Sequence, residues 1–465
     1  MDDLLDRSDA LGLAEAIRTG EVSEQEVLDA TLARIDERNP ALRAITTAID
    51  PEPPADGRLR GVPFAIKDLH FPVRGTVTTH GSRLFADAPS DDHDAEVVRR
   101  YRAAGLVLVG RSNSPEFGLS TTTEPSLFGP CANPLDVTRS AGGSSGGAAA
   151  AVASGMLTMA HASDGGGSIR IPSSACGLFG LKPSRGRMSF GPDAGEGWSG
   201  YSCTHVITRS VRDSAVMLDL TAGLAPGDPY TAPAPAGPFE QALATPPRRL
   251  RIAVWDGAPD GIELDPVARA ALNEAVALCE ELGHDLEEAD LPVRRGDMGG
   301  AQGVITAAHT AALVARRAAQ AGRPAGDEIE PVAAMMVERA KGMSAADYAE
   351  ALRTTHRLGR LMGQYHASGI DLVLTPTLAA VPPPLGELVA TADNVAEWGA
   401  RQGTYSPFCA MANATAQPAM SVPLYRDDRG LTVGSHFIAP YGDEALLLQL
   451  AAQLEQARPF WLGPS

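Results

Sequence analysis

Lysine is scarce in this sequence. Of its 39 lysine and arginine residues only three are lysines, namely Lys67, Lys182 and Lys341. Arginine stays protonated in proteins, whereas a buried lysine can lose its proton and act as a base. Lys67 follows the apolar run at residues 62–66, which makes it a candidate base at the end of a buried strand. The alternative is a strand-end lysine that extends to Asp68 and pairs with it.

A surplus of basic charge is also missing. The formal net charge is −18, so the chain has no basic excess with which to release counterions from nucleic acid or an anionic membrane. No segment approaches the roughly 20 apolar residues that cross a bilayer. The N-terminal residues 1–4 lack the basic and apolar regions of a secretory signal. These absences predict a cytoplasmic protein that binds neither nucleic acid nor membrane.

Cysteine and metal-binding patterns are sparse as well. The five cysteines are scattered, odd in number and form no CxxC pair, which predicts reduced, structural thiols. Cys176 lies near a Gly/Ser segment, but packing is the better explanation of a cysteine there. The polar segment at residues 91–94 suits the N-terminal end of a helix. No two of the ten histidines have HxxxH spacing, so neither a metal nor another cofactor is expected.

What the sequence does contain fits a large α/β protein. Its 465 residues exceed the usual size of one domain, so two cores or one large sheet are expected. A hydrophobic fraction of 44% and 48 glycines suit an α/β fold with many tight turns. The order helix, glycine, strand at residues 95–109 is typical of that class. A Pro/Ala-rich stretch at residues 226–247 separates two groups of elements.

Periodicity and end signals predict further elements along the chain. Helices are expected at residues 10–19, 24–38, 266–282, 304–321, 345–366 and 443–456, and strands at 156–162, 250–254, 371–374, 419–423 and 432–438. Ser23 and Glu26 form a capping box for the second helix, and Asn39-Pro40 is expected to end it.

Two Gly/Ser clusters lie close together, at residues 140–147 and 164–172. Both lead into ordered apolar segments, which argues against a pair of flexible linkers. Glycine permits positive φ and lets backbone N–H groups converge on one point. Ser168, which follows three glycines, is therefore well placed to be a nucleophile beside an oxyanion hole.

Two other interpretations of these clusters fail. Residues 142–146 match the GxSxG nucleophile elbow of α/β-hydrolases, which requires a strand directly before the serine. Residues 133–139 instead suggest a turn-rich loop. The elbow would also leave Lys67 and the second cluster without a role. A phosphate-binding loop is excluded because neither cluster contains a lysine.

Several segments together resemble the amidase signature family. They are GVPFAIKD at residues 61–68, GRSNSPE at 110–116, AGGSSGG at 141–147, DGGGSIRIP at 164–172, GLFGLKP at 177–183 and QPAMSVP at 417–423. In GRSNSPE, Arg111 and Ser112 stand where the family usually has lysine and threonine. The resemblance covers nearly the whole chain, and the combined motifs are highly specific.

By position, the resemblance assigns the catalytic roles. Lys67 would be the base, Ser144 a bridging serine preceded by a cis peptide bond, and Ser168 the nucleophile. The interval of 24 residues between the two serines agrees with the family. Serine needs a base to take its proton, and no histidine lies in the signature segments. Lys67 must then be neutral, which requires burial or a cationic neighbour. Lys182 is expected to be structural and Lys341 to be solvated.

The resemblance also assigns the surroundings of the nucleophile. It implies an oxyanion hole at Gly165, Gly166 and Gly167, with support from Ser145, Asp164 and Arg170. Gly165 departs from the family, which usually has threonine, isoleucine or a similar residue there. We expect the missing side chain to loosen the loop and to open space beside the scissile carbonyl. It should change substrate preference rather than catalysis.

The implied architecture is one α/β domain over residues 1–465 with the amidase-signature fold. Helices would cover both faces of a large central mixed β-sheet. Residues 61–225 would be the catalytic core, which holds the signature motifs. Residues 226–400 would be a helical region of the same fold that shapes the access of substrate. The oligomeric state is left open, with a homodimer among the options.

The implied activity is hydrolysis of a small-molecule carboxylic amide through an acyl-serine intermediate. Esters and carbamates (urethanes) are further substrates of related enzymes. The pattern is most similar to the branch that contains the 6-aminohexanoate cyclic-dimer hydrolases and bacterial aryl acylamidases. The sequence segments shared with that branch lie at residues 122–125, 152–153 and 182–187.

Three alternatives stand beside this interpretation. An A-type amidotransferase subunit, which releases ammonia within a tRNA-dependent complex, shares the signature; the stretch at residues 226–247 and the family branch argue against it. A non-catalytic protein that keeps the fold is disfavoured because all three catalytic residue types are present. A Ser–His–Asp esterase would make Lys67 dispensable.

Overall fold

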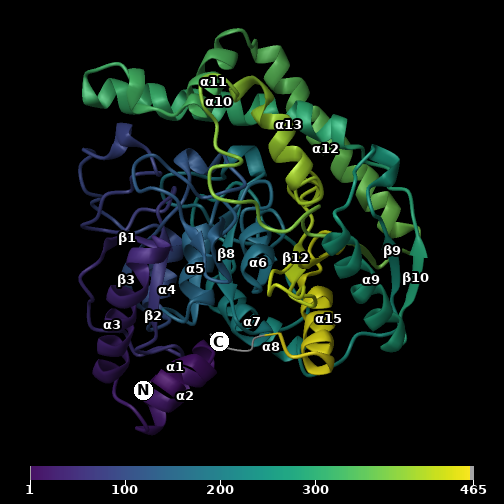
Figure 1. The fold of residues 1–465 in the computed structure, drawn as a ribbon, viewed down its shortest axis with the longest axis horizontal. Coiled ribbons are helices and arrows are strands. Elements are labelled where there is room, and N and C mark those ends of the chain that lie inside the picture. Colours follow the sequence, from purple (N-terminus) through teal and green to yellow (C-terminus); the bar gives the residue numbers. More distant parts are fainter. Residues whose placement is uncertain (1, 461–465) are drawn as a thin grey trace.

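The computed structural model describes residues 2–460, and the strands in this range form three sheets. The strands are β1 Ile45–Ala48, β2 Pro63–Lys67, β3 Val107–Ser112, β4 Ala132–Asn133, β5 Asp136–Ser140, β6 Met159–Asp164, β7 Phe179–Lys182, β8 Cys203–Thr208, β9 Arg251–Val254, β10 Asp285–Glu288, β11 Leu372–Pro376, β12 Ala419–Val422 and β13 Ser435–Ile438. The central sheet has eight strands in the order β10–β9–β11–β13–β12–β7–β8–β6. Figure 1 labels four of them, β8, β12, β9 and β10, from the centre of the view to its right.

The central sheet is mixed. Strand β9 runs parallel to β10 and β11, and all other neighbouring strands are antiparallel. A smaller sheet, β1–β3–β2, lies at its edge because β2 packs beside β6. This placement brings the end of β2 next to the end of β6, so Lys67 lies near the start of the second Gly/Ser cluster.

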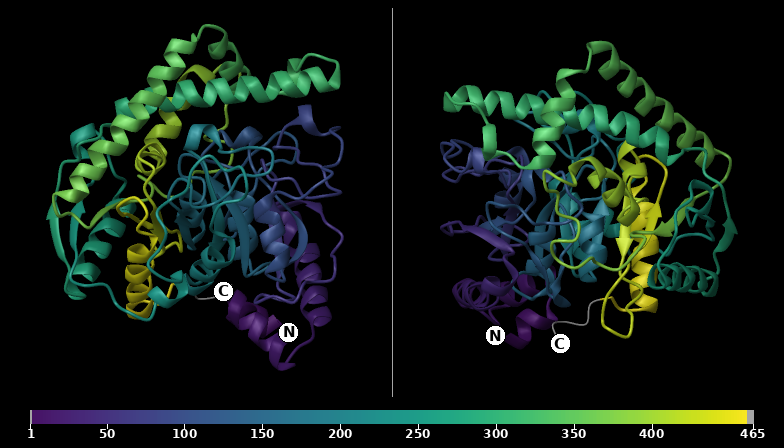
Figure 2. Two further views of the ribbon diagram at one scale, coloured as in Figure 1. Left: turned by 180° about the vertical axis from the view of Figure 1, so that it is seen from behind. Right: turned by 45° about the horizontal axis from the view of Figure 1, so that its top comes forward.

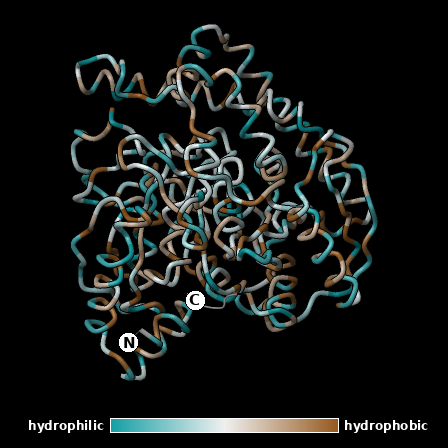
Figure 3. The backbone as a smooth tube through the Cα atoms, viewed as in Figure 1, coloured by the Kyte–Doolittle hydropathy of each residue, from teal (hydrophilic) through white to brown (hydrophobic). Residues whose placement is uncertain are grey.

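Helices surround the sheets and connect them. They are α1 Asp2–Arg7, α2 Ala10–Thr19, α3 Glu24–Leu42, α4 Glu96–Ala103, α5 Gly146–Ala153, α6 Arg170–Cys176, α7 Val211–Thr221, α8 Phe239–Ala242, α9 Pro266–Glu281, α10 Arg295–Ala321, α11 Pro331–Lys341, α12 Ala345–Ala367, α13 Val395–Tyr405, α14 Ala410–Ala414 and α15 Glu444–Ala457. In Figure 3 the colour of the backbone alternates along the outer helices, as expected where one helix face is buried.

Alternating side chains distribute the core between the two faces of the central sheet. Leu372 and Leu374 of β11 join the hydrophobic cluster formed with α7, α9 and α15. Val373, which lies between them, joins the cluster formed with α10 and α12 on the opposite face. This is the expected result of the two-residue repeat of a strand. The predicted α/β architecture, with helices on both faces of a large mixed sheet, is confirmed.

Helices α10–α13 form a layer over one side of the molecule. Figures 1 and 2 show α10 and α11 crossing above the sheet and α12 and α13 running down beside it. Helix α10 packs on α11, α12 and α14, and α11 packs on α13. All four helices of the layer come from the region at residues 226–400 or its immediate C-terminal extension. The division of the chain into a catalytic and a substrate-shaping region stays a prediction.

Several helix boundaries differ from those expected. Helix α3 continues through Pro40 and ends at Leu42, followed by Arg43 in the left-handed conformation. The capping box of Ser23 and Glu26 is present as expected. Helix α10 begins at Arg295, nine residues before the predicted start, and α11 and α13 were not among the helices predicted.

The segment at residues 133–139 is also different from the prediction. It contains most of a two-stranded hairpin, β4–β5, rather than a loop without strands. Strand β5 pairs with β4 outside the central sheet, and its middle residues are exposed. The strand that a nucleophile elbow uses to reach the top of a central sheet is therefore still missing before Ser144. Within residues 2–460 no helix is long and apolar enough to span a membrane.

Candidate active site

Lys67 points toward the first Gly/Ser cluster. In β2 the side chains of Phe64 and Ile66 join one hydrophobic cluster, and Ala65 joins the cluster around α5. Alternation therefore directs Lys67 to the α5 side, where the turn before α5 carries two serines. Its Nζ forms hydrogen bonds with three serine hydroxyls, at 2.7 Å from Ser144 Oγ, 2.9 Å from Ser145 Oγ and 3.1 Å from Ser163 Oγ.

Burial makes the ammonium form of Lys67 much less favourable than that of a lysine in water. The side chain is fully buried, and burial lowers its pKa to about 7, while the negative charge of Asp164 acts in the opposite direction. No carboxylate in residues 2–460 forms an ion pair with Lys67 Nζ. Burial without a counter-ion is the condition under which a lysine serves as a base near neutral pH.

The three hydroxyl partners match a neutral amine. Ser145 donates its own hydroxyl proton to the Ser163 carbonyl oxygen, so it must accept a hydrogen bond from Lys67. A neutral amine has two N–H groups and one lone pair. Donation to Ser145 and Ser163 uses both N–H groups, which leaves the lone pair of Nζ facing the Ser144 hydroxyl.

His161 fixes the backbone of Lys67 and is not a catalytic base. Its Nδ1 accepts a hydrogen bond from the Lys67 backbone N–H, at 3.1 Å, so the proton of the neutral ring lies on Nε2. That nitrogen contacts Thr204 Oγ1 at 2.7 Å. Burial lowers the pKa of His161 well below its ordinary value. The ring is therefore neutral and has both nitrogens engaged in structural contacts.

The other lysines and Asp68 behave as structural groups. Asp68 accepts hydrogen bonds from Thr79 and lies 3.9 Å from the Arg111 guanidinium, so the proposed pairing of Lys67 with Asp68 is wrong. Lys182 is buried and donates to the Pro183 carbonyl oxygen. Lys341 is exposed and pairs with Glu338, as expected of a solvated residue.

The turn that carries Ser144 requires glycine. The peptide bond between Gly143 and Ser144 is cis, as the family resemblance implied. A Cβ on Gly143 would lie 2.6 Å from the carbonyl oxygen of Thr122. A Cβ on Gly147 would lie 2.2 Å from the backbone nitrogen of Asn113. Both contacts are with backbone atoms, so any side chain at these positions would displace the turn.

Ser168 lies at the other side of the site, two residues before α6. It is 9% exposed and lines a cavity of about 630 Å³. The N–H of Gly167 donates to Asp164 Oδ1 at 2.7 Å. No hydrogen bond from the N–H groups of Gly165 and Gly166 to another group is found in the described part of the chain. Both donors therefore remain available.

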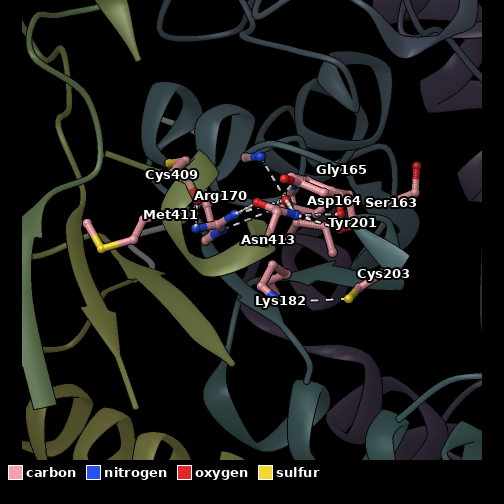
Figure 4. A network of polar contacts seen from close by, with 12 residues as sticks. Ser163, Asp164, Gly165, Arg170, Lys182, Tyr201, Cys203, Cys409, Met411 and Asn413 are labelled. Carbon is pink, nitrogen blue, oxygen red and sulfur yellow. Dashed lines mark hydrogen bonds and ion pairs between the residues drawn. The ribbon is translucent and has the colours of Figure 1, made fainter. Parts of the chain in front are cut away.

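A buried charged network holds the second cluster in place (Figure 4). Arg170 donates to both carboxylate oxygens of Asp164, at 2.9 Å each, and to the side-chain oxygen of Asn413. Asn413 in turn donates to the carbonyl and Oδ1 of Asp164. Burial acts to raise the pKa of Asp164, but the charge and hydrogen bonds of Arg170 hold it well below its ordinary value.

The space beside Gly165 is occupied, contrary to expectation. A Cβ on Gly165 would lie 2.8 Å from both Cε3 and Cζ3 of Trp198 and 3.0 Å from Ser202 Oγ. Trp198, Ser199 and Gly200 all have positive φ, which turns the chain so that the indole faces the loop. The missing side chain therefore makes room for Trp198 and opens no free space.

Two further contacts tie this region to the layer of helices. Gln302 of α10 donates from Nε2 to the carbonyl oxygen of Gly165 at 3.3 Å. Ser199 Oγ contacts His309 Nε2 of α10 at 3.0 Å and also the Tyr348 hydroxyl of α12. The Gly165 C=O and the Gly166 N–H belong to one trans peptide bond, so they point in opposite directions. The hydrogen bond from Gln302 to this C=O therefore orients the Gly166 N–H away from the Gln302 side chain. Sequence reasoning missed Gln302 and Trp198.

The cavity in front of Ser168 opens between the second cluster and helices α10, α11 and α13. It is lined by Gly118, Leu119, Ser120, Thr121, Gly166, Ser168, Ile171, Trp198, Asp260, Arg295, Gly296, Met298, Gly299, Gln302, Gly303, Thr306, Met336, Arg339, Trp398, Gly399, Gln402, Gly403, Ser406, Pro407 and Ala410.

The five cysteines are free and buried, and burial raises the pKa of the Cys176 thiol well above its ordinary value. Within residues 2–460 no group of three or more potential metal-ligating side chains occurs.

Comparison with known proteins identifies the family. Residues 24–448 match the family described as Amidase. The chain belongs to the amidase signature family. It is 36% identical over 470 residues to the 6-aminohexanoate-cyclic-dimer hydrolase of Pseudomonas sp. (strain NK87), covering 97% of this chain and 95% of that enzyme. The family membership establishes a hydrolase that acts on amides.

Solved structures agree with this assignment. The structure of a 6-aminohexanoate cyclic dimer hydrolase complexed with substrate superposes with a TM-score of 0.93 at 34% identity and covers 100% of this chain and 99% of that one. A bacterial aryl acylamidase of the amidase signature family gives a TM-score of 0.84 at 26% identity, covering 98% and 97% of the two chains. The resemblance to the branch that contains these two enzymes is confirmed.

Proposed function

We propose that this amidase cleaves carboxylic amides through an acyl-serine intermediate, with Ser168 as nucleophile, Ser144 as proton relay and Lys67 as base. The observation that supports it most is the contact of Lys67 Nζ with Ser144 Oγ at 2.7 Å, at a lysine whose pKa burial lowers to about 7. A serine becomes an effective nucleophile when an adjacent base takes its proton.

In the acylation step Ser168 Oγ attacks the amide carbonyl carbon. Its proton passes to Ser144 Oγ as the proton of Ser144 passes to Lys67 Nζ. When the tetrahedral intermediate collapses, the C–N bond breaks and the leaving amine takes a proton from Ser144. Ser144 is then reprotonated by Lys67, which returns to the neutral state.

Water resolves the acyl-enzyme by the same relay. It attacks the ester carbonyl carbon while its proton moves through Ser144 to Lys67. The C–O bond to Ser168 then breaks, and Ser168 recovers its proton from Ser144. The products are a carboxylic acid and an amine, and no redox cofactor or metal is required by this balance.

The N–H groups of Gly165 and Gly166 are assigned to the oxyanion in both steps. They are free of other partners among the described residues, whereas the N–H of Gly167 is bonded to Asp164 Oδ1. Gly167 thus serves the hole by shaping the loop rather than as a donor. Ser145, Asp164 and Arg170 support the site through the hydrogen bonds described above.

The substrate class follows from the site and the relatives. The cavity of about 630 Å³ has room for a small molecule larger than a simple primary amide. Amides are the principal substrates. Esters and carbamates are further substrates, because Ser168 can attack their carbonyl carbon in the same way. An amidotransferase subunit would need partner chains to act, so hydrolysis of amides by the purified chain alone distinguishes it from the proposal.

Covalent labelling tests the nucleophile directly. Ser168→Ala should lower amide hydrolysis by roughly four orders of magnitude or more while the protein stays folded. A fluorophosphonate should add one adduct to the wild-type protein, located at Ser168 by peptide mass spectrometry. Ser126→Ala, which changes an exposed serine outside the cavity, is the matched control and should retain labelling. An adduct at Ser144 or Cys176 would contradict the assignment.

A further inference from the structure

Two arginines line the cavity that contains Ser168. They are Arg295, at the first position of α10, and Arg339, near the end of α11. The remaining charged residue of the lining is Asp260. The cavity of a protein with a net charge of −18 therefore carries more positive than negative side chains.

Both guanidinium groups are seated against glycines of a neighbouring helix. A Cβ on Gly403 of α13 would lie 2.2 Å from NH2 of Arg295. A Cβ on Gly303 of α10 would lie 2.7 Å from NH1 of Arg339. Each arginine crosses from its own helix to a helix that leaves room for it. This packing holds the two charged groups beside the cavity.

Neither guanidinium is neutralised by the protein. Within residues 2–460 no hydrogen bond or ion pair is formed by the side chain of Arg295 or of Arg339. Asp260 accepts a hydrogen bond from the backbone N–H of Arg295 at 3.0 Å, and its carboxylate faces the Arg294 guanidinium at 3.7 Å. Arg294 also pairs with Asp290. The acidic group of the cavity is thus engaged elsewhere, and the donors of both arginines remain open.

The position of Arg295 on α10 sets its distance from the reacting carbonyl. Arg295 lies seven residues before Gln302, whose amide contacts the Gly165 carbonyl at 3.3 Å. Seven residues are close to two helical turns, so both side chains share a face, about 10 Å apart along the axis. A group bound by Arg295 would therefore be several methylene lengths from the scissile carbonyl.

We propose that Arg295 binds a carboxylate carried by the substrate at the far end of a flexible chain, and that Arg339, on the same cavity lining, adds to the positive charge that attracts it. Guanidinium groups bind carboxylates through paired, charge-assisted hydrogen bonds. The preferred substrates are then amides that bear a negative charge, such as the monoamide of a dicarboxylic acid or an N-acylated ω-amino acid. This inference rests on the proposed function, because it assigns the specificity of the same site.

Matched substrate pairs test the charge preference. One pair is adipic acid monoanilide and hexanoic anilide, with the carboxylate on the acyl side. The second is N-benzoyl-6-aminohexanoate and N-benzoylhexylamine, with the carboxylate on the amine side. For at least one pair kcat/KM should favour the acid by about tenfold or more, as expected for hydrogen bonds to a charged group. The acid preference should weaken at high salt and with two methylenes removed.

Variants assign the preference to the two arginines. In Arg295→Gln/Arg339→Gln the ratio of acid to neutral substrate should fall to about one, mainly through a higher KM for the acid. Arg339→Glu should shift the preference toward a substrate that ends in an amine. Arg360→Gln, which changes an exposed arginine of α12 outside the cavity, should leave the ratio as in the wild type. An equal rate for acid and neutral substrates in the wild type, or an unchanged ratio in the double variant, would overturn the proposal.

Binding separates this inference from the catalytic proposal. Calorimetry with Ser168→Ala measures the affinity for adipic acid monoanilide and hexanoic anilide without turnover. Tighter binding of the acid, lost when the two arginines are also changed, supports the carboxylate site even if hydrolysis is never observed. Failure of the wild type to hydrolyse any of the four amides would instead refute the proposed function.

Discussion

Trp198 occupies the place that a side chain at position 165 would take. The indole carbons Cε3 and Cζ3 would lie 2.8 Å from a Cβ on Gly165, which is closer than carbon atoms approach. The two residues are 33 positions apart in the sequence, yet the side chain at each position limits the size of the side chain that fits at the other. We infer that Trp198 supplies the wall beside the candidate oxyanion loop in this chain, an arrangement that requires glycine at position 165.

Gly165→Ile should therefore be harmful in the wild type and tolerated in Trp198→Ala. Forcing an extra side chain into a packed site costs about 1–3 kcal/mol, and removal of the indole would provide the space. The free energy of unfolding and kcat/KM of the four proteins form a double-mutant cycle. We expect a favourable coupling of about 1–3 kcal/mol in stability, together with recovery of activity in the double variant.

Gly300→Ile provides the comparison for this cycle. Gly300 lies in α10, within the layer formed by helices α10–α13, and a Cβ there would meet no atom within 4 Å. Its substitution should have the same effect with Trp198 or with alanine at position 198. Equal penalties for Gly165→Ile in the two backgrounds would show that Trp198 does not occupy the space as described.

The candidate triad could be predicted from sequence because its parts lie in contiguous motifs. Lys67 ends an apolar strand, and Ser144 and Ser168 each sit in a glycine-rich turn, so local pattern and family resemblance agree. Trp198 and Gln302 belong to no such motif. They reach the site only when β6, the turn at residues 198–200 and α10 are brought together, and neither periodicity nor spacing records that contact.

Glycine content explains why the start of α10 was missed. Gly296, Gly299, Gly300 and Gly303 lie in its first turns, and glycine weakens a helical pattern because it raises the conformational entropy lost on folding. Tertiary packing on α11, α12 and α14 holds the helix there. Three of these glycines, Gly296, Gly299 and Gly303, line the cavity, and Gly303 also leaves room for Arg339. The segment that the sequence predicts least well is therefore one wall of the cavity.

Asp164→Asn should destabilise the protein far more than an exposed change. Arg170 would lose its buried carboxylate partner, and breaking a buried pair costs about 3–5 kcal/mol. The folded-state pKa of Asp164 lies below its ordinary value of 3.8, so its stabilising contribution is present above that pH and is lost as pH falls further. Urea unfolding should show a deficit at pH 7 that shrinks in acid. Glu338→Gln, at an exposed pair, should have little effect.

Activity should rise as pH increases through about 7. The base must be neutral, and burial lowers the pKa of Lys67 to about 7, so kcat/KM should fall about tenfold per unit below that value. The limb belongs to the coupled Lys67–Ser144–Ser168 unit rather than to one group. Lys67→Arg should lose about 10²–10⁴-fold because arginine cannot accept the proton. Lys341→Arg should keep the wild-type profile, whereas a fully active Lys67→Arg would make residue 67 structural.

Ser144→Ala should impair amide cleavage more than ester cleavage. An amine leaves only after it is protonated, and Ser144 is the group that receives a proton from Lys67 at 2.7 Å and can deliver it. Loss of this general acid should lower the rate for an anilide by about 10²–10⁴-fold. A p-nitrophenyl ester expels a stable phenolate that needs no proton, so only the activation of Ser168 would suffer.

Comparison of a p-nitrophenyl ester and an anilide that share one acyl group isolates this difference. Deacylation is then common to both substrates, and acylation can be followed by single-turnover kinetics. Ser145→Ala is the control, because it removes another hydroxyl that contacts Lys67 Nζ, at 2.9 Å, without removing the relay. It should lower both acylation rates by a similar factor. If Ser144→Ala also slows the anilide and the ester equally, Ser144 is not the proton donor and the leaving group must draw its proton from another source.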